Sequence, residues 1–290
     1  MQEMKFETPT TLDAAVGLLK TAGGAACVLA GGTDLLVQLR TERIEPSMVV
    51  DIKRIPGLQD ITQIDDGGFR IGAAVSCQAL GEHAALKTAW PGVVEGAELI
   101  GSTQIQGRAS MGGNLCNASP AADSVPGMVA AAATVTIFGP DGEREMPVED
   151  FCMSPGQTSL SIGEMVAFIN IPAPAPRTGD AYLRFIPRTE MDIAVAGAGI
   201  SLSLDENGKC TSARVALGAV AERVLLVEEA ASALTGTTID AVALGKLASA
   251  ASAAARPIDD KRGTAEYRTR VVGVLARRAA IIAHERAGGL

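Results

Sequence analysis

The feature that most limits how this chain can fold is an apolar run that ends on two consecutive glycines. The run extends from Ala26 to Ala30, the pair Gly31-Gly32 follows, and apolar residues at helical spacing resume at Leu35. A buried strand, a tight turn and a helix account for this order, because glycine adopts turn conformations that a Cβ disfavours. Met48 to Ile52 is a second run of strand length. Residues 1–55 are therefore predicted to form a small α/β subdomain.

A proline-rich segment, Ile171 to Pro176, divides the rest of the chain, since alternating prolines hold an extended linker. Turn signals and hydrophobic periodicity predict hairpins and helices on both sides of it. We expect helices at 12–19 (with Thr10 and Asp13 as its capping pair), 77–86, 93–100, 227–234, 239–255 and 266–287, and hairpins formed by 61–64 with 69–75, around a turn at 140–142, and by 193–204 with 210–217. The prediction is an α+β protein with a first domain at 1–176, divided near residue 56, and a second at 177–290.

Composition and charge exclude several classes of protein. The net charge of −8 argues against a nucleic-acid partner, because such proteins present basic faces. Five cysteines stand singly and the two histidines lie far apart, which predicts reduced thiols and no metal site. Neither a run of about 18 apolar residues nor an apolar leader is visible. We therefore expect a cytoplasmic protein without a membrane span.

The first candidate site is the turn from Leu29 to Leu35. Its glycines allow a close backbone approach to an anion, and Thr33 adds a hydroxyl donor. A phosphate group suits such a turn. The alternative is a plain turn in which Thr33 or Asp34 caps the following helix.

The second candidate is a stretch of small and amide residues from Ser110 to Asp123. Glycine amides, the Ser110 hydroxyl and the amides of Asn114 and Asn117 could aim several neutral donors at a pyrophosphate. Asp123 could accept hydrogen bonds from sugar hydroxyls. The alternative is an Ω-loop packed on itself.

Taken together, the two loops resemble a known paired flavin signature. Ala30-Gly31-Gly32-Thr33-Asp34, then Ser110-Met111-Gly112-Gly113-Asn114 and Ala118 to Asp123, are similar to the loops of the medium subunits of carbon monoxide dehydrogenase and xanthine dehydrogenase-type enzymes. The segments Arg188 to Ala194 and Tyr267-Arg268 resemble the C-terminal flavoprotein domain of that family. The resemblance covers essentially the whole chain.

The resemblance implies an FAD-binding domain of the p-cresol methylhydroxylase type, with two α/β subdomains, followed by a small α+β flavoprotein domain. It places both loops at the pyrophosphate and Asp123 at sugar or ribityl hydroxyls, with a flavin wall completed from the second domain. The residues that it assigns to FAD are Leu29, Ala30, Gly31, Gly32, Thr33, Asp34, Leu35, Ile100, Gly101, Ile105, Ala109, Ser110, Gly113, Asn114, Cys116, Asn117, Ala122, Asp123, Arg184 and Ile193.

Alternatives remain open for several of these residues. Ile100 and Ile105 could be ordinary core residues, and Arg184 a solvated surface charge. Ile193 stands where some relatives place an aromatic side chain, which leaves flavin stacking there in doubt. Relatives that reduce aromatic thioesters carry a cysteine-rich insertion that this chain lacks.

The function that the resemblance implies is electron transfer within a molybdenum hydroxylase. A large subunit with a molybdenum cofactor would oxidise the substrate, and a small [2Fe–2S] subunit would pass electrons to the FAD of this chain, in a dimer of heterotrimers. This chain would then need no catalytic acid, base or nucleophile. The alternatives are a free-standing flavin oxidoreductase of the same fold and a scaffold domain that has lost its flavin.

Overall fold

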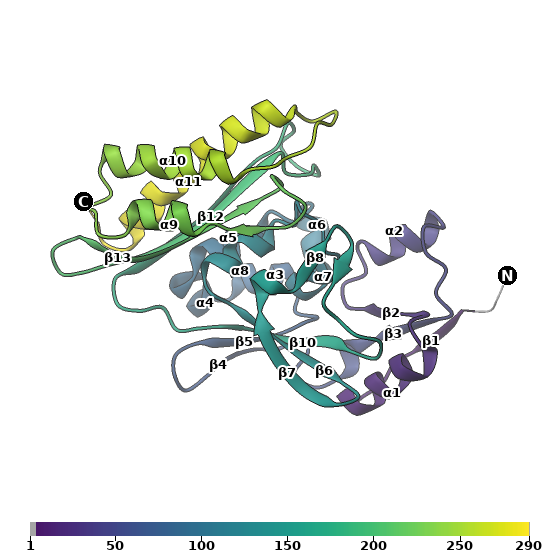
Figure 1. The fold of residues 1–290 in the computed structure, drawn as a ribbon. Helices are drawn as coiled ribbons and strands as arrows, with labels where there is room; N and C mark the ends of the chain where they lie inside the picture. The colour runs from purple at the N-terminus through teal and green to yellow at the C-terminus, as the bar shows by residue number, and fades with distance from the viewer. Residues whose placement is uncertain (1–3, 290) are drawn as a thin grey trace.

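The structure, a computed structural model, describes residues 4–289 and begins with a small parallel sheet (Figure 1). β3 lies in the centre, paired with β1 on one side and β2 on the other. The expected strand, glycine turn and helix are confirmed. The elements of this subdomain are β1 (Lys5–Glu7), α1 (Leu12–Ala22), β2 (Ala26–Leu29), α2 (Leu35–Arg40) and β3 (Met48–Asp51), followed by the 3₁₀ turn η1 (Ile52–Arg54).

The cap of α1 differs from the expected one by one residue. The Thr11 hydroxyl, and not that of Thr10, accepts a hydrogen bond from the Ala14 amide at 3.2 Å. The helix ends at Gly23, whose φ of +59° is a left-handed conformation that glycine tolerates. Ala15, Val16 and Leu19 are its buried face, as their spacing predicts.

The second subdomain is built on a five-stranded antiparallel sheet with the order β4-β5-β10-β6-β7. Both expected hairpins are present. The sequence reasoning missed β10, which lies at the centre of the sheet and is almost entirely buried. The strands here are β4 (Ile61–Gln63), β5 (Phe69–Gly72), β6 (Thr134–Gly139), β7 (Gly142–Pro147), β10 (Met165–Ile171) and the separate pair β8 (Cys152–Ser154) and β9 (Gln157–Thr158).

The helices of this subdomain correct two expectations. The helix expected at 77–86 is broken at His83, which ends α3 and caps α4 by accepting from the Leu86 amide at 3.1 Å. The stretch from Ser110 is not wholly a loop, since it contains α7, and Ser110 is the N-cap. The helices are α3 (Cys77–Glu82), α4 (Ala84–Ala89), α5 (Pro91–Glu98), α6 (Thr103–Gln106), α7 (Met111–Cys116), α8 (Ser124–Ala130) and the turn η2 (Val148–Asp150).

The C-terminal part is an antiparallel sheet, β11-β12-β13-β14, with three helices on one face (Figure 1). The Asn-Gly hairpin and the three helices are confirmed. β11 was not expected, and β12 begins three residues later than the predicted strand. The elements are β11 (Thr178–Phe185), β12 (Ala196–Leu204), β13 (Cys210–Gly218), β14 (Leu225–Leu226), α9 (Glu228–Leu234), α10 (Ala241–Ala254) and α11 (Ala265–Arg286).

Two hydrophobic cores meet across a close interface. One core is formed chiefly by residues before the proline segment, and the other by residues after it. α8 packs against α5 on one side and against β12 and β13 on the other. Asp180, on β11, accepts a hydrogen bond from the Val93 amide at 3.2 Å. The side-chain carboxyl group of Asp180, from the second part, therefore caps the N-terminus of α5 in the first.

Candidate cofactor-binding site

A cavity of about 500 Å³ lies where the first subdomain faces the second. Most of the predicted loop residues form its wall, including those of the turn after β2 and those of α7. The predicted residues that line it are Ala30, Gly31, Gly32, Thr33, Asp34, Leu35, Ile100, Ala109, Ser110, Gly113, Asn114, Cys116 and Asn117. The structure thus brings together two segments that lie about eighty residues apart in the sequence.

The turn after β2 touches the residues just before the second loop at Gly31. A Cβ built there would lie 1.9 Å from the Arg108 carbonyl oxygen, a distance that no side chain could occupy. Gly32 has a φ of +80°, which also favours glycine. By contrast, a Cβ at Gly113 would meet only the Ser110 Oγ, at 3.1 Å, because Gly113 borders the cavity. Gly31 therefore allows the two segments to approach closely, whereas Gly113 leaves open space in the cavity.

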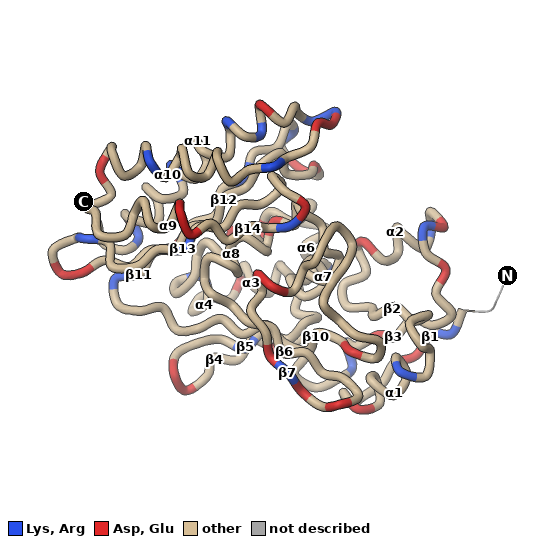
Figure 2. The backbone as a smooth tube through the Cα atoms, in the orientation of Figure 1, with Lys and Arg blue, Asp and Glu red and all other residues tan. Residues whose placement is uncertain are grey.

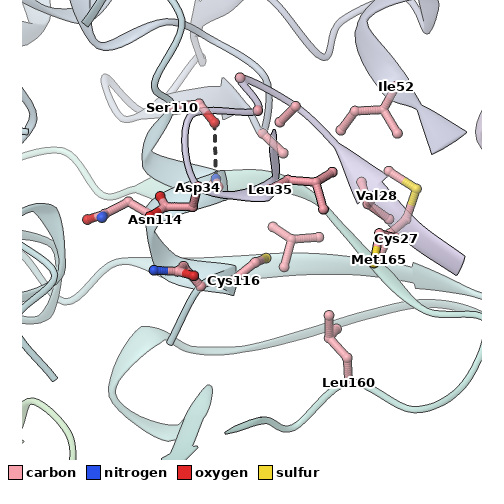
Figure 3. Close-up of a pocket in the computed structure, with 18 of the residues that line it drawn as sticks. Cys27, Val28, Asp34, Leu35, Ile52, Ser110, Asn114, Cys116, Leu160 and Met165 are labelled. Atoms are coloured by element: carbon pink, nitrogen blue, oxygen red, sulfur yellow. Dashed lines mark hydrogen bonds between the residues drawn. The ribbon is translucent and has the colours of Figure 1, made fainter. Parts of the chain in front are cut away.

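Two asparagine side chains are oriented by internal hydrogen bonds. The Asn114 Oδ1 accepts from the Ser124 hydroxyl at 2.8 Å, and the Asn117 Oδ1 accepts from the Gln38 Nε2 at 3.2 Å. Because each amide oxygen is engaged, each NH₂ group is left to donate elsewhere. The Ser110 Oγ accepts from the Gly113 amide at 3.0 Å, the dashed contact in Figure 3. This bond uses the Gly113 amide but leaves the hydroxyl hydrogen free to donate.

Asp34 occupies the N-cap position of α2 without making a side-chain cap hydrogen bond. Its carboxyl group faces the cavity, and partial burial raises its pKa. A second cavity, of about 440 Å³, shares Thr33, Asp34, Gln38 and Asn117 with the first and adds Arg43. The turn after β2 therefore borders both spaces.

The apolar part of the larger cavity was missed by the sequence reasoning. Cys27 and Val28 of β2 form one side, and Leu160, before β10, and Met165, the first residue of β10, form another (Figure 3). The apolar run that begins at Met165 was the available signal, since it has the length and composition of a buried strand. These side chains suit a flat aromatic group better than a charged one.

Seven predicted residues do not line either cavity: Leu29, Gly101, Ile105, Ala122, Asp123, Arg184 and Ile193. Gly101 has a φ of +63°, and a Cβ there would collide with Ile105. Ile100 and Ile105 are partly buried against the larger core, so the core alternative describes them well. Ile193 is 51% exposed.

Asp123 and Arg184 form a buried ion pair between the two parts of the chain. The side chain of Arg184 is only 6% exposed, so it is not a solvated surface charge. The other oxygen of Asp123 accepts from the Tyr182 hydroxyl at 2.9 Å. Burial raises the pKa of Asp123 to about 6, although the arginine and the tyrosine oppose this rise. Both carboxylate oxygens are thus engaged within the protein.

The described residues were also compared with the requirements of a metal site and of a membrane-spanning helix. Within residues 4–289, no group of three His, Cys, Asp or Glu side chains is placed to hold a metal ion. None of the helices in that part of the chain is long and apolar enough to cross a membrane. The five cysteines are free thiols, and Cys77 and Cys210 are buried.

The chain has two joined α+β parts with a glycine-lined cavity in the first, and comparison with known proteins identifies the class to which it belongs. Residues 2–174 match the family described as the FAD binding domain in molybdopterin dehydrogenase. Residues 181–283 match the CO dehydrogenase flavoprotein C-terminal domain. The chain belongs to the FAD-binding medium subunits of the carbon monoxide and xanthine dehydrogenase type of molybdenum hydroxylase.

Individual relatives match nearly the whole chain. The carbon monoxide dehydrogenase medium chain of Afipia carboxidovorans is 34% identical over 97% of this chain and 97% of its own length. The xanthine dehydrogenase FAD-binding subunit of Escherichia coli O157:H7 is 30% identical over 98% and 97%. A crystal structure of Cu,Mo-CO dehydrogenase in its cyanide-inactivated form is similar with a TM-score of 0.93, at 34% identity and 98% coverage of both chains. The family confirms the expected fold class and FAD as the cofactor.

Proposed function

We propose that this chain accepts electrons from a small [2Fe–2S] subunit and passes them to an external acceptor, while a large molybdenum subunit oxidises the substrate. The observation that carries the proposal is the contact of Gly31 with Arg108, just before the second loop, which brings two distant segments together at one cavity wall. The near-complete match to proteins named as medium chains or FAD subunits supports the division into subunits. We propose a dimer of heterotrimers as the assembly, with free thiols suited to the cytoplasm.

The residues fit a bound FAD. We propose that the NH₂ groups of Asn114 and Asn117 and the Ser110 hydroxyl donate to the pyrophosphate, for which neutral donors suffice. The apolar pocket around Val28 and Met165 would receive the adenine ring. Asp34 would accept from a sugar hydroxyl there. When bound, FAD supplies the electron-transfer chemistry, and the protein fixes its position.

The flavin end would lie toward the second domain. Ile100 lines the cavity, and we propose that it marks the flavin end and that Gly101, Ile105 and Ile193 complete the wall there. The pair of Asp123 and Arg184 would position this wall by joining the two domains, which we propose divide at residue 176. Asp123 would contact ribityl hydroxyls only if the Tyr182 or Arg184 contact shifts, because both of its oxygens are engaged.

The test separates electron transfer from substrate oxidation. The isolated chain, reconstituted with FAD and shown to lack iron and molybdenum, should be bleached by dithionite under anaerobic conditions. Purines, N-heterocycles, aldehydes and carbon monoxide should leave its flavin oxidised until the partner subunits are added. Direct flavin reduction by one of these substrates would instead support a free-standing oxidoreductase, and failure to bind FAD would support a scaffold that has lost it.

A further inference from the structure

The solvent side of α11 carries a continuous stripe of cationic and apolar side chains. It consists of Tyr267, Arg270, Val274, Arg277 and Arg278, spaced three or four residues apart so that they share one helical face. Tyr267 is 43% exposed and Val274 is 49% exposed, and the three arginines are exposed as well. The opposite face of the helix packs into the second core. We call these five residues the α11 stripe.

The charge of the stripe is opposite to that of the chain. Residues 241–286 contain nine Lys and Arg against four Asp and Glu, whereas the remainder contains sixteen against twenty-nine. Figure 2 shows Lys and Arg positions, interspersed with Asp and Glu, along the top of the molecule, where α10 and α11 lie. Within the described part of the chain, Arg270, Arg277 and Arg278 make no ion pair. Glu266 lies four residues before Arg270 on the same helix, but it forms no ion pair with it.

One end of the stripe adjoins the loop that faces the proposed flavin end. The rings of Tyr267 and Phe185 lie edge to face, with centroids 5.9 Å apart, and Phe185 directly follows Arg184. Asp192, in the loop between β11 and β12, pairs with Arg262 at 3.0 Å, just before α11. Exposed Ile193 belongs to the same loop. The Tyr267 end of the stripe therefore lies beside this loop.

We propose that the α11 stripe is a docking surface for an acidic face of the iron–sulfur subunit. This inference rests on the proposed function, because it names where that electron donor binds. Arginine and tyrosine are enriched at protein interfaces, and unpaired cations on an acidic chain steer a partner of opposite charge. A donor bound at the Tyr267 end of the stripe would lie near the loop that we place at the flavin end of the cofactor site.

The test uses the assembly purified through an affinity tag on this chain, expressed together with its partner subunits at about 0.15 M salt. The variant Arg270→Glu, Arg277→Glu, Arg278→Glu should retain FAD, while its iron-to-flavin ratio falls about tenfold or more. The matched control Lys20→Glu, Lys209→Glu, Arg223→Glu makes the same change in net charge at exposed positions on other faces. It should keep the wild-type iron-to-flavin ratio.

Each outcome decides one claim. A wild-type assembly that contains neither iron nor molybdenum overturns the proposed function itself. Wild-type iron retention in the triple stripe variant, or an equal loss in the control, overturns the docking surface and leaves that function standing. Dimerisation of the isolated chain through the stripe would also overturn the docking surface. If the triple variant loses FAD, Arg277→Gln with Arg278→Gln decides: its iron content should be lower than that of the wild type at low salt and should depend less on salt, and a wild-type salt response overturns the proposal.

Discussion

Replacing Gly113 with valine should remove FAD binding while leaving the apoprotein folded. A Cβ at this position would meet only the Ser110 Oγ, at 3.1 Å, and the rest of the side chain would project into the cavity. We expect the free energy of unfolding of the apoprotein to change by less than about 1 kcal/mol, because glycine is itself a poor helix residue. The affinity for FAD should fall at least about a hundredfold, or roughly 2.7 kcal/mol.

Thermal unfolding with and without FAD measures both effects. At a hundredfold excess of FAD over its dissociation constant, the wild type should gain about 2.7 kcal/mol of stability. For a protein of 290 residues, that gain corresponds to a rise in Tm of roughly 4–5 °C. Gly113→Val should show no such rise, and its Tm without FAD should stay close to that of the wild type.

Two further glycines serve as controls. Gly245 lies exposed on α10 with nothing within 4 Å of a Cβ, so Gly245→Val should keep the full FAD-dependent rise in Tm. Gly31→Ala should lose both stability and FAD binding, because its Cβ would lie 1.9 Å from the Arg108 carbonyl oxygen. A wild-type FAD response in Gly113→Val would refute the assignment of this cavity to the pyrophosphate.

Three other predictions follow from the site and from the domain interface. Arg184→Ala leaves the Asp123 carboxylate buried without its partner, so urea unfolding should show a loss of about 3–5 kcal/mol; a loss below about 1 kcal/mol would contradict the buried pair. Burial raises the pKa of Asp180 to about 7, so the folded state holds this proton more tightly, and the free energy of unfolding should fall as pH rises from about 4 to about 7. Because the pKa of Asp123 is also raised, to about 6, Asp180→Asn should reduce that fall without abolishing it, and equal slopes for the two proteins would exclude the Asp180 carboxyl as a contributor. Acid precipitation should release all the flavin to the supernatant, whereas a yellow pellet would reveal a covalent anchor such as Cys27 or Cys116.

Local chemistry explains what could be predicted from the sequence. Glycine pairs and amide residues indicate the turn after β2 and the stretch around α7. Asp-Gly and Asn-Gly turns indicate the hairpins. The apolar run at Met165 indicates a strand, but it does not show that this strand lies at the centre of the sheet. That place is determined by the two strands that pair with β10. The contact of Gly31 with Arg108 was equally hidden, since it depends on how the two subdomains dock.

The residues that link the domains were the least predictable. Asp123 and Arg184 stand sixty-one positions apart, and both were assigned to FAD by resemblance alone. Their pairing depends on the approach of β11 to α5 and α8, which no local pattern in the sequence specifies. The same docking turns Asp180 into a cap for α5. Whether Asp123 and Arg184 also contact the cofactor stays a prediction.

α8 limits how far the cofactor domain can be treated as a separable module. It begins directly after the second loop, and all seven of its residues are buried, partly by α5 and partly by β12 and β13. A fragment ending at residue 176 would expose the apolar side chains of that helix and would leave the first turn of α5 without its carboxylate cap. Such a fragment should aggregate, so the FAD site could not be transplanted into another protein without the C-terminal sheet that encloses it.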